Sequence, residues 1–283
     1  MTPPERYPPV PEPLEPGEGG GVVDDHTHLD GLPDHEVEAL LAAAAAAGVP
    51  RAVQIGCDLP AARWTAAAVD RWPQLLGGVA IHPNEAPLLA ARGELDAALA
   101  EVEALAASTE RIRVVGETGM DAFRTDLADP ADLKAQREAF AWHVDLAKRL
   151  GKTLQIHDRD AHDLVLDVLE AEGAPERTVF HCFSGDADLA RRCAAHGWYL
   201  SFAGTITFKN AHGLREALRA VPLELVQVET DAPYLTPVPH RGRPNASHLL
   251  PHTVRAVAQV LGRDTRQTSD VLTQTARHLY GAW

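Results

Sequence analysis

The stretch RIRVVGETGMDAFRTDLADPADLKAQREAFAWHVDLAKRLGKTLQIH, residues 111–157, decides the fold. It opens with the β-rich run RIRVVGE, continues through a helix-like segment rich in Ala, Leu, Arg and Glu, and closes with a second β-rich run, TLQIH. Gly151 follows the helix-like segment and is a typical helix stop. A strand, a helix and a second strand in this order predict two parallel strands joined by a right-handed crossover.

The same alternation continues along the chain from residue 22. The eight β-rich runs are residues 22–29, 52–56, 77–82, 111–117, 153–157, 178–181, 198–202 and 224–231. Eight strands close a (β/α)8 barrel, and the length of 283 residues is close to the usual size of about 250. Residues 252–281 predict two further helices that pack on the outside. We therefore expect an α/β protein with one (β/α)8 TIM-type barrel domain over residues 22–283.

An open, doubly wound sheet would produce the same alternation of strands and helices. Polar residues, however, fall at the ends of the first, third, fourth, fifth, sixth and eighth expected strands. An open sheet gathers its ligands at one topological switch point. In a barrel, the carboxyl end of every strand faces one shared mouth. The spread of polar residues over six strand ends therefore favours the barrel.

The N-terminal segment differs in composition from the rest of the chain. Residues 1–20 contain seven prolines and four glutamates, which cannot bury enough apolar surface to fold alone. We expect a Pro-rich extended arm over residues 1–21. The arm could lie along the domain or could serve as a peptide ligand for a partner, because such segments occur in linkers and in recognition motifs.

The composition excludes several classes of protein. The chain has 26 Lys and Arg against 40 Asp and Glu, a net charge of −14 at pH 7. This charge argues against broad adhesion to nucleic acid but allows a nucleic-acid substrate that is gripped locally by metal ions. The N-terminus lacks the basic-then-apolar order of a signal peptide, and no run of about 18 apolar residues predicts a membrane span. The three cysteines are odd in number and widely spaced, which predicts reduced thiols in a cytoplasmic protein. For the oligomeric state we expect a monomer by default.

Candidate metal ligands lie at the ends of five of the expected strands. They are His26, His28, Glu117, His157, His181 and Asp231. His26 and His28 are two residues apart, so on a strand they point to the same side and can chelate one ion. Each residue alone could equally be a buried histidine, a turn residue or a helix-capping acid. Together, six imidazole and carboxylate groups exceed the needs of one tetrahedral ion and predict two divalent ions, with Glu117 between them.

The order of the motifs resembles the TatD family of metal-dependent deoxyribonucleases, within the amidohydrolase-like superfamily. The motifs are DDHTHLD, AIHPNEA, VVGETGMD, QIHDRDAH, VFHCFSG, ETDAPYLTP and RGRPN, over about residues 22–281. The resemblance implies a (β/α)8 barrel, a two-metal site and hydrolysis of DNA, often as a 3′-to-5′ exonuclease on single strands. It also implies that one metal is held by His26, His28 and Asp231 and the other by His157 and His181, with Glu117 shared.

The chain departs from the family pattern at three places outside the ligand set. Ala246 and Ser247 stand where the family usually has Glu-Pro, Thr275 stands where Asn is common, and Asp25 stands where many members have Ser. These departures leave the details of the substrate open.

The predicted mechanism uses a water whose pKa the two cations lower toward about 7. The activated water would attack the phosphorus of a phosphodiester, with Glu117 bridging the cations. Asp231 could accept the proton of the water, a role inferred from related barrels. His82, in AIHP, could touch the phosphate or protonate the leaving oxygen, or it could be a core or turn histidine.

The candidate substrate contacts are basic and aromatic side chains near the expected strand ends. The predicted phosphate contacts are Arg159, Lys209, Arg241 and Arg243, each of which could also be a solvated surface charge. The candidates for stacking on a base are Phe183, Phe202 and Phe208, each of which could also belong to the core.

The sequence leaves three functions open. The first is a deoxyribonuclease that cleaves phosphodiester bonds of single-stranded or frayed DNA, as a 3′-to-5′ exonuclease. The second is an amidohydrolase-type enzyme that acts on a small amide, an ester or aminoacyl-tRNA; many such enzymes carry a carboxylated lysine on the fourth strand, where this chain has Glu117. The third is a catalytically silent barrel that acts as a binding module, against which the complete ligand set argues. The ligand types fit Zn, Mg or Mn.

Overall fold

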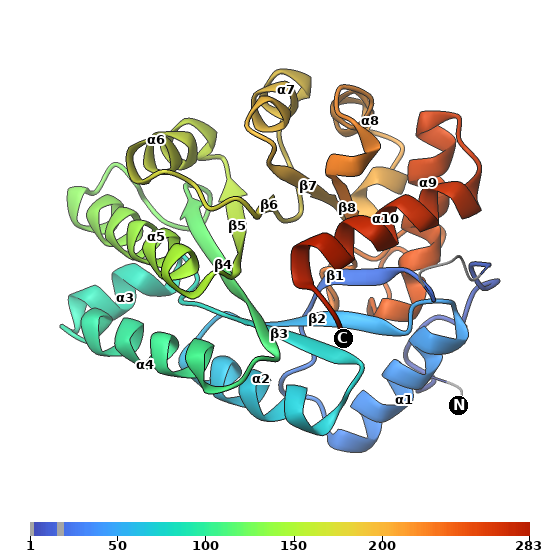
Figure 1. Cartoon of the computed structure of the whole chain (residues 1–283), viewed down its shortest axis with the longest axis horizontal. Helices are drawn as coiled ribbons and strands as arrows, with labels where there is room; N and C mark the ends of the chain where they lie inside the picture. Colours follow the sequence, from blue (N-terminus) through green and yellow to red (C-terminus); the bar gives the residue numbers. More distant parts are fainter. Residues whose placement is uncertain (1–2, 16–19) are drawn as a thin grey trace. The chain divides into compact units, whose positions relative to one another are not determined.

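The structure is a computed structural model that describes residues 3–15 and 20–283 (Figure 1). The predicted arm over residues 1–21 therefore lies partly outside the described residues, at 1–2 and 16–19. The chain divides into two compact units. Unit 1 comprises Met1–Gln54 and Gly185–Trp283, and unit 2 comprises Ile55–Ser184.

Strands and helices alternate along the chain, and the strands follow the chain order in the sheet. The strands are β1 (Val23–Thr27), β2 (Arg51–Gly56), β3 (Leu75–Val79), β4 (Ile112–Asp121), β5 (Thr153–Arg159), β6 (Thr178–Phe180), β7 (Tyr199–Phe202) and β8 (Val226–Val228). The main helices are α1 (Asp34–Ala46), α2 (Leu59–Arg71), α3 (Glu85–Ala91), α4 (Leu95–Ser108), α5 (Pro130–Leu150), α6 (His162–Glu172), α7 (Ala187–Ala195), α8 (His212–Arg219), α9 (Leu250–Leu261) and α10 (Thr265–Tyr280). Short 3-10 turns are η1 (Gly204–Thr207), η2 (Leu223–Leu225) and η3 (Ser247–Leu249).

The predicted strands are present, but several boundaries differ at the site. β1, β6 and β8 end at Thr27, Phe180 and Val228, so the candidate ligands His28, His181 and Asp231 follow their strands. β3 ends at Val79, so His82 lies in the turn after the strand rather than at its last residue. β4 runs to Asp121, beyond the expected end at Glu117, because residues 118–121 pair with residues 156–159 of β5. The longer β4 carries a second carboxylate, Asp121, past Glu117.

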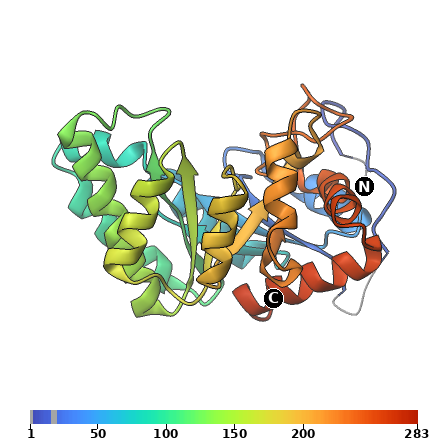
Figure 2. The same ribbon diagram turned by 90° about the horizontal axis from the view of Figure 1, so that it is seen from above.

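Unit 2 contains parallel pairs of β3 with β4, β4 with β5, and β5 with β6. Helix α5 begins where the Asp129 side chain accepts a hydrogen bond from the backbone N–H of Ala131, and ends at Gly151, which has a φ of +60°. Its apolar face, which includes Phe140 and Val144, is buried. Helices α4 and α5 pack against β4 (Figure 1), and the view from above shows α3 to α6 on one side of these strands (Figure 2).

Unit 1 contains parallel pairs of β1 with β2 and of β7 with β8. A parallel bridge between Thr27 and Ala232 joins the end of β1 to the segment that follows β8. Helix α10 packs against β1 and β8, and α9 packs against α10 (Figure 1). The two helices that were expected at the C-terminus are therefore α9 and α10.

The described part of the N-terminal arm is held by residues of unit 1. Tyr7 and Leu14 are buried, and the backbone N–H of Leu14 donates to the carbonyl oxygen of Ala47 at 3.0 Å. Arg243 donates to the carbonyl oxygens of Glu5, Arg6 and Tyr7 at 2.9–3.1 Å. One nitrogen of its guanidinium, Nη2, is therefore engaged by the arm. These contacts favour the alternative in which the arm lies along the domain.

Among the described residues, no helix combines the length and the apolar character that crossing a bilayer would require.

Candidate functional site

The first cluster of candidate ligands lies in unit 1 and comprises His26, His28 and Asp231, here called the His26 cluster. The Nε2 atoms of His26 and His28 are 3.2 Å apart. The Nε2 atom of His28 is 3.5 Å from Oδ1 of Asp231. The three ligand atoms all lie within 4.8 Å of one another. The structure therefore brings together three residues that are separated by about two hundred positions in the sequence.

The backbone around the bridge between Thr27 and Ala232 explains this arrangement. The N–H of Asp231 donates to the carbonyl oxygen of His26 at 3.0 Å, and the N–H of His28 donates to that of Ala232 at 2.8 Å. Asp231 has a φ of +52°, in the left-handed region that Asp tolerates better than most residues. The chain after β8 is thus pinned beside the end of β1, which places the Asp231 carboxylate next to the two imidazoles.

Two buried acids of β1, Asp24 and Asp25, precede His26, and Asp24 supports the segment that follows β8. Asp24 accepts hydrogen bonds from the backbone N–H and the hydroxyl of Thr230, at 2.8 and 2.6 Å. Burial raises the pKa of Asp24 to about 6, against the hydrogen bonds from Ser247 and Thr230, which favour its charged form. Burial also raises the pKa of Asp25, which accepts a hydrogen bond from the hydroxyl of Tyr280, to about 8. Asp24 therefore anchors the residue that precedes Asp231, while Asp25 is largely neutral at pH 7.

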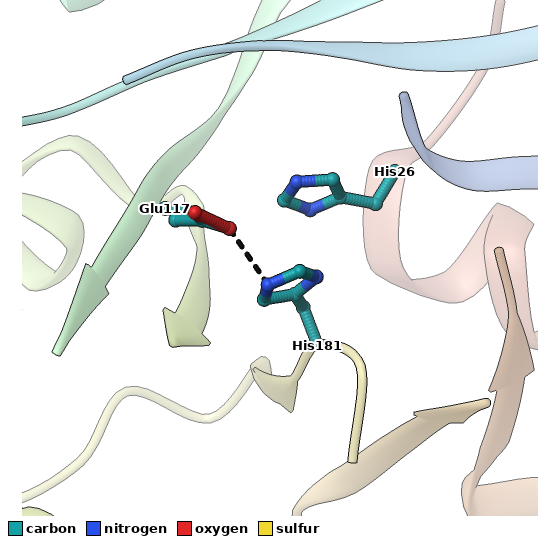
Figure 3. Close-up of side chains that lie close together, drawn as sticks. All are labelled: His26, Glu117 and His181. Carbon is teal, nitrogen blue, oxygen red and sulfur yellow. Dashed lines mark ion pairs between the residues drawn. The ribbon is translucent and has the colours of Figure 1, made fainter. Parts of the chain in front are cut away.

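The second cluster lies in unit 2 and is centred on Glu117 of β4. Nε2 of His181 is 2.7 Å from Oε2 of Glu117, an ion pair that Figure 3 draws as a dashed line. On the other oxygen, Oε1, Nε2 of His82 is at 3.0 Å and Nδ1 of His157 is at 3.7 Å. We call these four residues the Glu117 cluster. The structure thus gathers three imidazoles around one carboxylate.

The charges of the Glu117 cluster follow from burial and from these contacts. Glu117 is 6% exposed, and burial disfavours its charged form. The neighbouring His181 and His82 more than offset this effect and hold the pKa of Glu117 well below its usual value. Burial lowers the pKa of His82, against the attraction of Glu117. An ionised carboxylate and a neutral imidazole are the forms that bind a divalent cation.

Three residues beside the Glu117 cluster were not predicted. Asp121 also belongs to β4 and is 1% exposed, and its Oδ2 atom is 3.1 Å from Nε2 of His157. Asn84 donates to the same oxygen of Asp121 at 3.0 Å. The thiol of Cys57 lies 3.8 Å from Oε1 of Glu117. The position of Asp121, four residues after Glu117 on one strand, is the signal that could have revealed it.

A buried histidine of α5 was also missed. His143 is fully buried; its Nε2 accepts from the backbone N–H of Ile81 at 3.2 Å, and its Nδ1 is 3.0 Å from the hydroxyl of Thr118. Ile81 precedes His82, and Thr118 follows Glu117. Burial lowers the pKa of His143 to about 4. His143 is therefore neutral at pH 7 and ties two residues adjacent to the cluster to α5.

The predicted substrate contacts occupy different environments. The Arg159 guanidinium lies 4.2 Å from the ring centroid of Phe123, and that of Arg241 lies 4.1 Å from the centroid of Phe208. Lys209 is exposed. Two of the proposed stacking residues, Phe183 and Phe202, are only 4% and 1% exposed and belong to the core. Phe123, at 62% exposure, was not predicted.

Comparison with known proteins gives close relatives over nearly the whole chain. Residues 23–281 match the family model described as "TatD related DNase". The chain is 48% identical to the metal-dependent hydrolase TatD of Mycobacterium tuberculosis, over 92% of this chain and 98% of that protein. It is 34% identical to the metal-dependent hydrolase YcfH of Escherichia coli (strain K12), over 92% of this chain and 95% of that protein.

Solved structures show the same fold. YJJV, a TatD homologue from Escherichia coli K12, superposes with a TM-score of 0.84 at 24% identity, over 94% of this chain and 100% of that chain. A hydrolase of the same family from Entamoeba histolytica gives a TM-score of 0.77 at 15% identity, over 92% of this chain and 98% of that chain. The predicted (β/α)8 barrel is thereby confirmed.

Proposed function

This chain belongs to the TatD family and is a metal-dependent hydrolase, and we propose that it is a deoxyribonuclease that cleaves phosphodiester bonds of DNA. The observation that carries the proposal is the pair of ligand clusters, with three imidazoles gathered around the Glu117 carboxylate in unit 2 and two beside Asp231 in unit 1. The family model, which names a DNase, supports the choice of substrate. We also propose a 3′-to-5′ direction on single-stranded or frayed ends, as the resemblance of the sequence motifs implies.

The donor atoms suit divalent cations. Two nitrogens that are each about 2.0–2.1 Å from a tetrahedral ion lie about 3.3 Å apart. The Nε2 atoms of His26 and His28, 3.2 Å apart, fit this spacing. Imidazole and carboxylate groups accept Zn, Mn or Mg. We therefore propose that His26, His28 and Asp231 would hold one cation, and that Glu117, His157 and His181 would hold a second.

Cations bound at these clusters would supply an activated water and would neutralise charge that develops on phosphoryl oxygens. Asp231, beside His28, would take the proton from the attacking water. Nδ1 of His82 accepts a hydrogen bond from the backbone N–H of Asn84 at 3.1 Å. The proton of His82 is therefore on Nε2, the nitrogen that faces Glu117. This N–H is the group that His82 would offer to a phosphate oxygen or to the leaving oxygen.

A panel of substrates tests the proposal. We expect a 5′-labelled single-stranded DNA to give a ladder that shortens from its 3′ end, and expect little turnover of RNA, model amides or aminoacyl-tRNA. Cleavage should disappear with EDTA and return with Zn, Mn or Mg. Turnover of an amide or of aminoacyl-tRNA, with DNA left intact, would reject the nuclease and support an amidohydrolase-type reaction.

Replacement of the central carboxylate tests the shared role that the sequence motifs imply for Glu117. Glu117→Gln keeps the volume of the side chain but removes its charge, so we expect cleavage to be abolished and at most one ion to be retained per chain. Metal analysis of the purified protein gives the stoichiometry. Wild-type cleavage with two ions still bound would show that Glu117 is not shared. A cytoplasmic location and a monomeric state remain predictions.

A further inference from the structure

We propose that Asp121 is a positioning residue that selects the tautomer of His157, and thereby which of its nitrogens faces Glu117 with a free lone pair. The carboxylate holds the proton of His157 on Nε2, so that Nδ1 carries the lone pair offered to a cation. The inference deepens the proposed function, because it rests on a cation at the Glu117 cluster, but it does not depend on which substrate is cleaved.

The two nitrogens of His157 face two different carboxylates. Nε2 is 3.1 Å from Oδ2 of Asp121, which is within hydrogen-bond range. Nδ1 is 3.7 Å from Oε1 of Glu117, which is too long for a hydrogen bond but suits two ligands of one ion. A neutral imidazole has only one N–H, and an ionised carboxylate can only accept. The proton therefore belongs on Nε2 with Asp121, and the lone pair on Nδ1 points toward Glu117.

Asp121 can impose this choice because its own side chain is fixed. It is 1% exposed. Its Oδ1 accepts the backbone N–H groups of Phe123 and Arg124 at 2.8 and 2.7 Å, and its Oδ2 accepts from the side chain of Asn84 at 3.0 Å as well as from His157. A carboxylate held by three donors besides His157 has no freedom to follow the ring. The imidazole must therefore adapt to the carboxylate.

The backbone holds the two residues in register. Gly119 of β4 pairs with His157, and Asp121 pairs with Arg159, in the parallel ladder of β4 with β5. The N–H of Asp121 donates to the side chain of Gln136 on α5 at 3.0 Å. Carboxylate–histidine–metal arrangements of this kind orient the ring and raise the basicity of the ligating nitrogen.

The substitution Asp121→Asn gives an outcome that a purely structural role does not. The backbone N–H groups of Phe123 and Arg124 require an acceptor, so the amide oxygen of the new side chain takes the place of Oδ1. The amide NH2 group then faces Nε2 of His157 and donates to it. The imidazole proton then moves to Nδ1, so Nδ1 no longer has a lone pair to offer to a cation. The isosteric Asp121→Asn should therefore impair metal binding at least as much as Asp121→Ala.

Nitrogen NMR of the metal-free protein reads the tautomer directly. With histidine labelled on both ring nitrogens, and with His157 assigned from the signals lost in His157→Gln, we expect Nε2 to be protonated in the wild type and Nδ1 in Asp121→Asn. A wild-type His157 protonated on Nδ1 would overturn the inference without any need for the variant to fold.

Calorimetric titration with Zn or Mn alone gives the second readout. We expect the weaker of the two bound ions to lose about 10–100-fold in affinity in Asp121→Asn. Asp160→Asn, at an exposed residue just past β5 with a φ of +55°, should bind both ions as the wild type does. Wild-type affinity in Asp121→Asn, or a clearly milder loss than in Asp121→Ala, would overturn the inference. Neither readout uses DNA, so a failure of the nuclease proposal would be seen separately in the substrate panel.

Discussion

At the scale of single residues, the histidines of unit 2 have their protons placed by neighbouring groups. The backbone N–H of Asn84 donates a hydrogen bond to Nδ1 of His82, and that of Ile81 donates one to Nε2 of His143. A ring nitrogen that accepts a hydrogen bond cannot also carry the proton. Each ring therefore has a defined donor nitrogen, which is Nε2 in His82 and Nδ1 in His143. Fixed tautomers of this kind let a site present ligands and donors without rearrangement.

His143 should make stability depend on pH. Burial lowers its pKa to about 4, against about 6.5 in an unfolded chain. Between these values the unfolded state binds a proton that the folded state does not, so stability decreases as the pH falls through this window. His143 alone should lower the free energy of unfolding by about 3 kcal/mol from pH 6.5 to pH 4. The raised pKa values of Asp24 and Asp25 act in the opposite direction over the same range, so the contribution of His143 is read as the difference between the wild type and a variant that lacks it.

Urea unfolding at several pH values measures this contribution. His143→Gln removes the titrating group and should remove this contribution from the pH dependence, whereas His35→Gln, at an exposed position, should leave it unchanged. The same slope in His143→Gln as in the wild type would assign the pH dependence to other groups.

Phe123 should contribute to binding of nucleic acid. Its ring is 62% exposed and lies under the Arg159 guanidinium, an arrangement that can stack on a base and contact a phosphate. Phe123→Ala should weaken binding of a phosphorothioate single-stranded oligonucleotide by about 1–3 kcal/mol and leave the melting temperature nearly unchanged. Leu88→Ala, at another exposed apolar residue, is the matched control. Equal affinities for both variants and the wild type in fluorescence anisotropy would exclude the ring from the substrate path.

At the scale of elements, the pairing of β4 with β5 brings the ligands of unit 2 together. The ladder extends from Val114 paired with Thr153 to Asp121 paired with Arg159. It places Glu117 and Asp121 on one strand and His157 on the next. The two backbones approach closely at Gly119, where an added Cβ would lie 2.0 Å from the carbonyl oxygen of His157.

Gly119→Ala should therefore damage both stability and metal binding. Gly119 also has a φ of +142°, which residues with a side chain rarely adopt. The clash is with backbone atoms, so the strands must separate and move His157, and we expect a loss of at least about 2 kcal/mol in the free energy of unfolding. Gly213→Ala lies in α8, and an added Cβ there meets no atom within 4 Å, so it should not destabilise the protein and should stabilise it by up to about 1 kcal/mol. Similar denaturant midpoints for the two variants would contradict this account.

At the scale of the whole molecule, the charge limits how nucleic acid can be held. The chain has a net charge of −14, so attraction to a polyanion must come from local cations and from a few basic side chains. The exposed candidates that are not hydrogen-bonded to the N-terminal arm are Arg159, Lys209 and Arg241. A small number of contacts predicts weak binding that is less sensitive to salt than that of a protein with a basic face.

The salt dependence of binding counts these contacts. A plot of log affinity against log salt concentration, for a phosphorothioate single strand, should have a slope of roughly −2, since each neutralised phosphate contributes about −0.7. Arg241→Ala should reduce the slope by about 0.7, and Arg92→Ala should not change it, because Arg92 is paired with Glu94 in unit 2. An unchanged slope in Arg241→Ala would remove Arg241 from the contact set.

Local patterns in the sequence predicted the order of strands and helices, and the spacing of His26 and His28 predicted that both point to one side. Such signals depend on residues a few positions apart, because strand alternation, helix caps and glycine stops are local properties of the backbone. The sequence also supplied all six candidate ligands, each at or near the end of a β-rich run. The departures, such as the earlier end of β3 and the longer β4, arose because pairing with a neighbouring strand sets where each strand ends.

Only the tertiary structure identified the groups that hold these ligands. Asp121 meets His157 across 36 positions, Asn84 meets Asp121 across 37, and His143 meets Ile81 across 62. The tertiary structure also showed that Phe183 and Phe202 are buried, whereas Phe123 is exposed. A hydrogen bond between strands, or the burial of a ring, depends on which distant segments pack together, and no pattern of neighbouring residues records that choice.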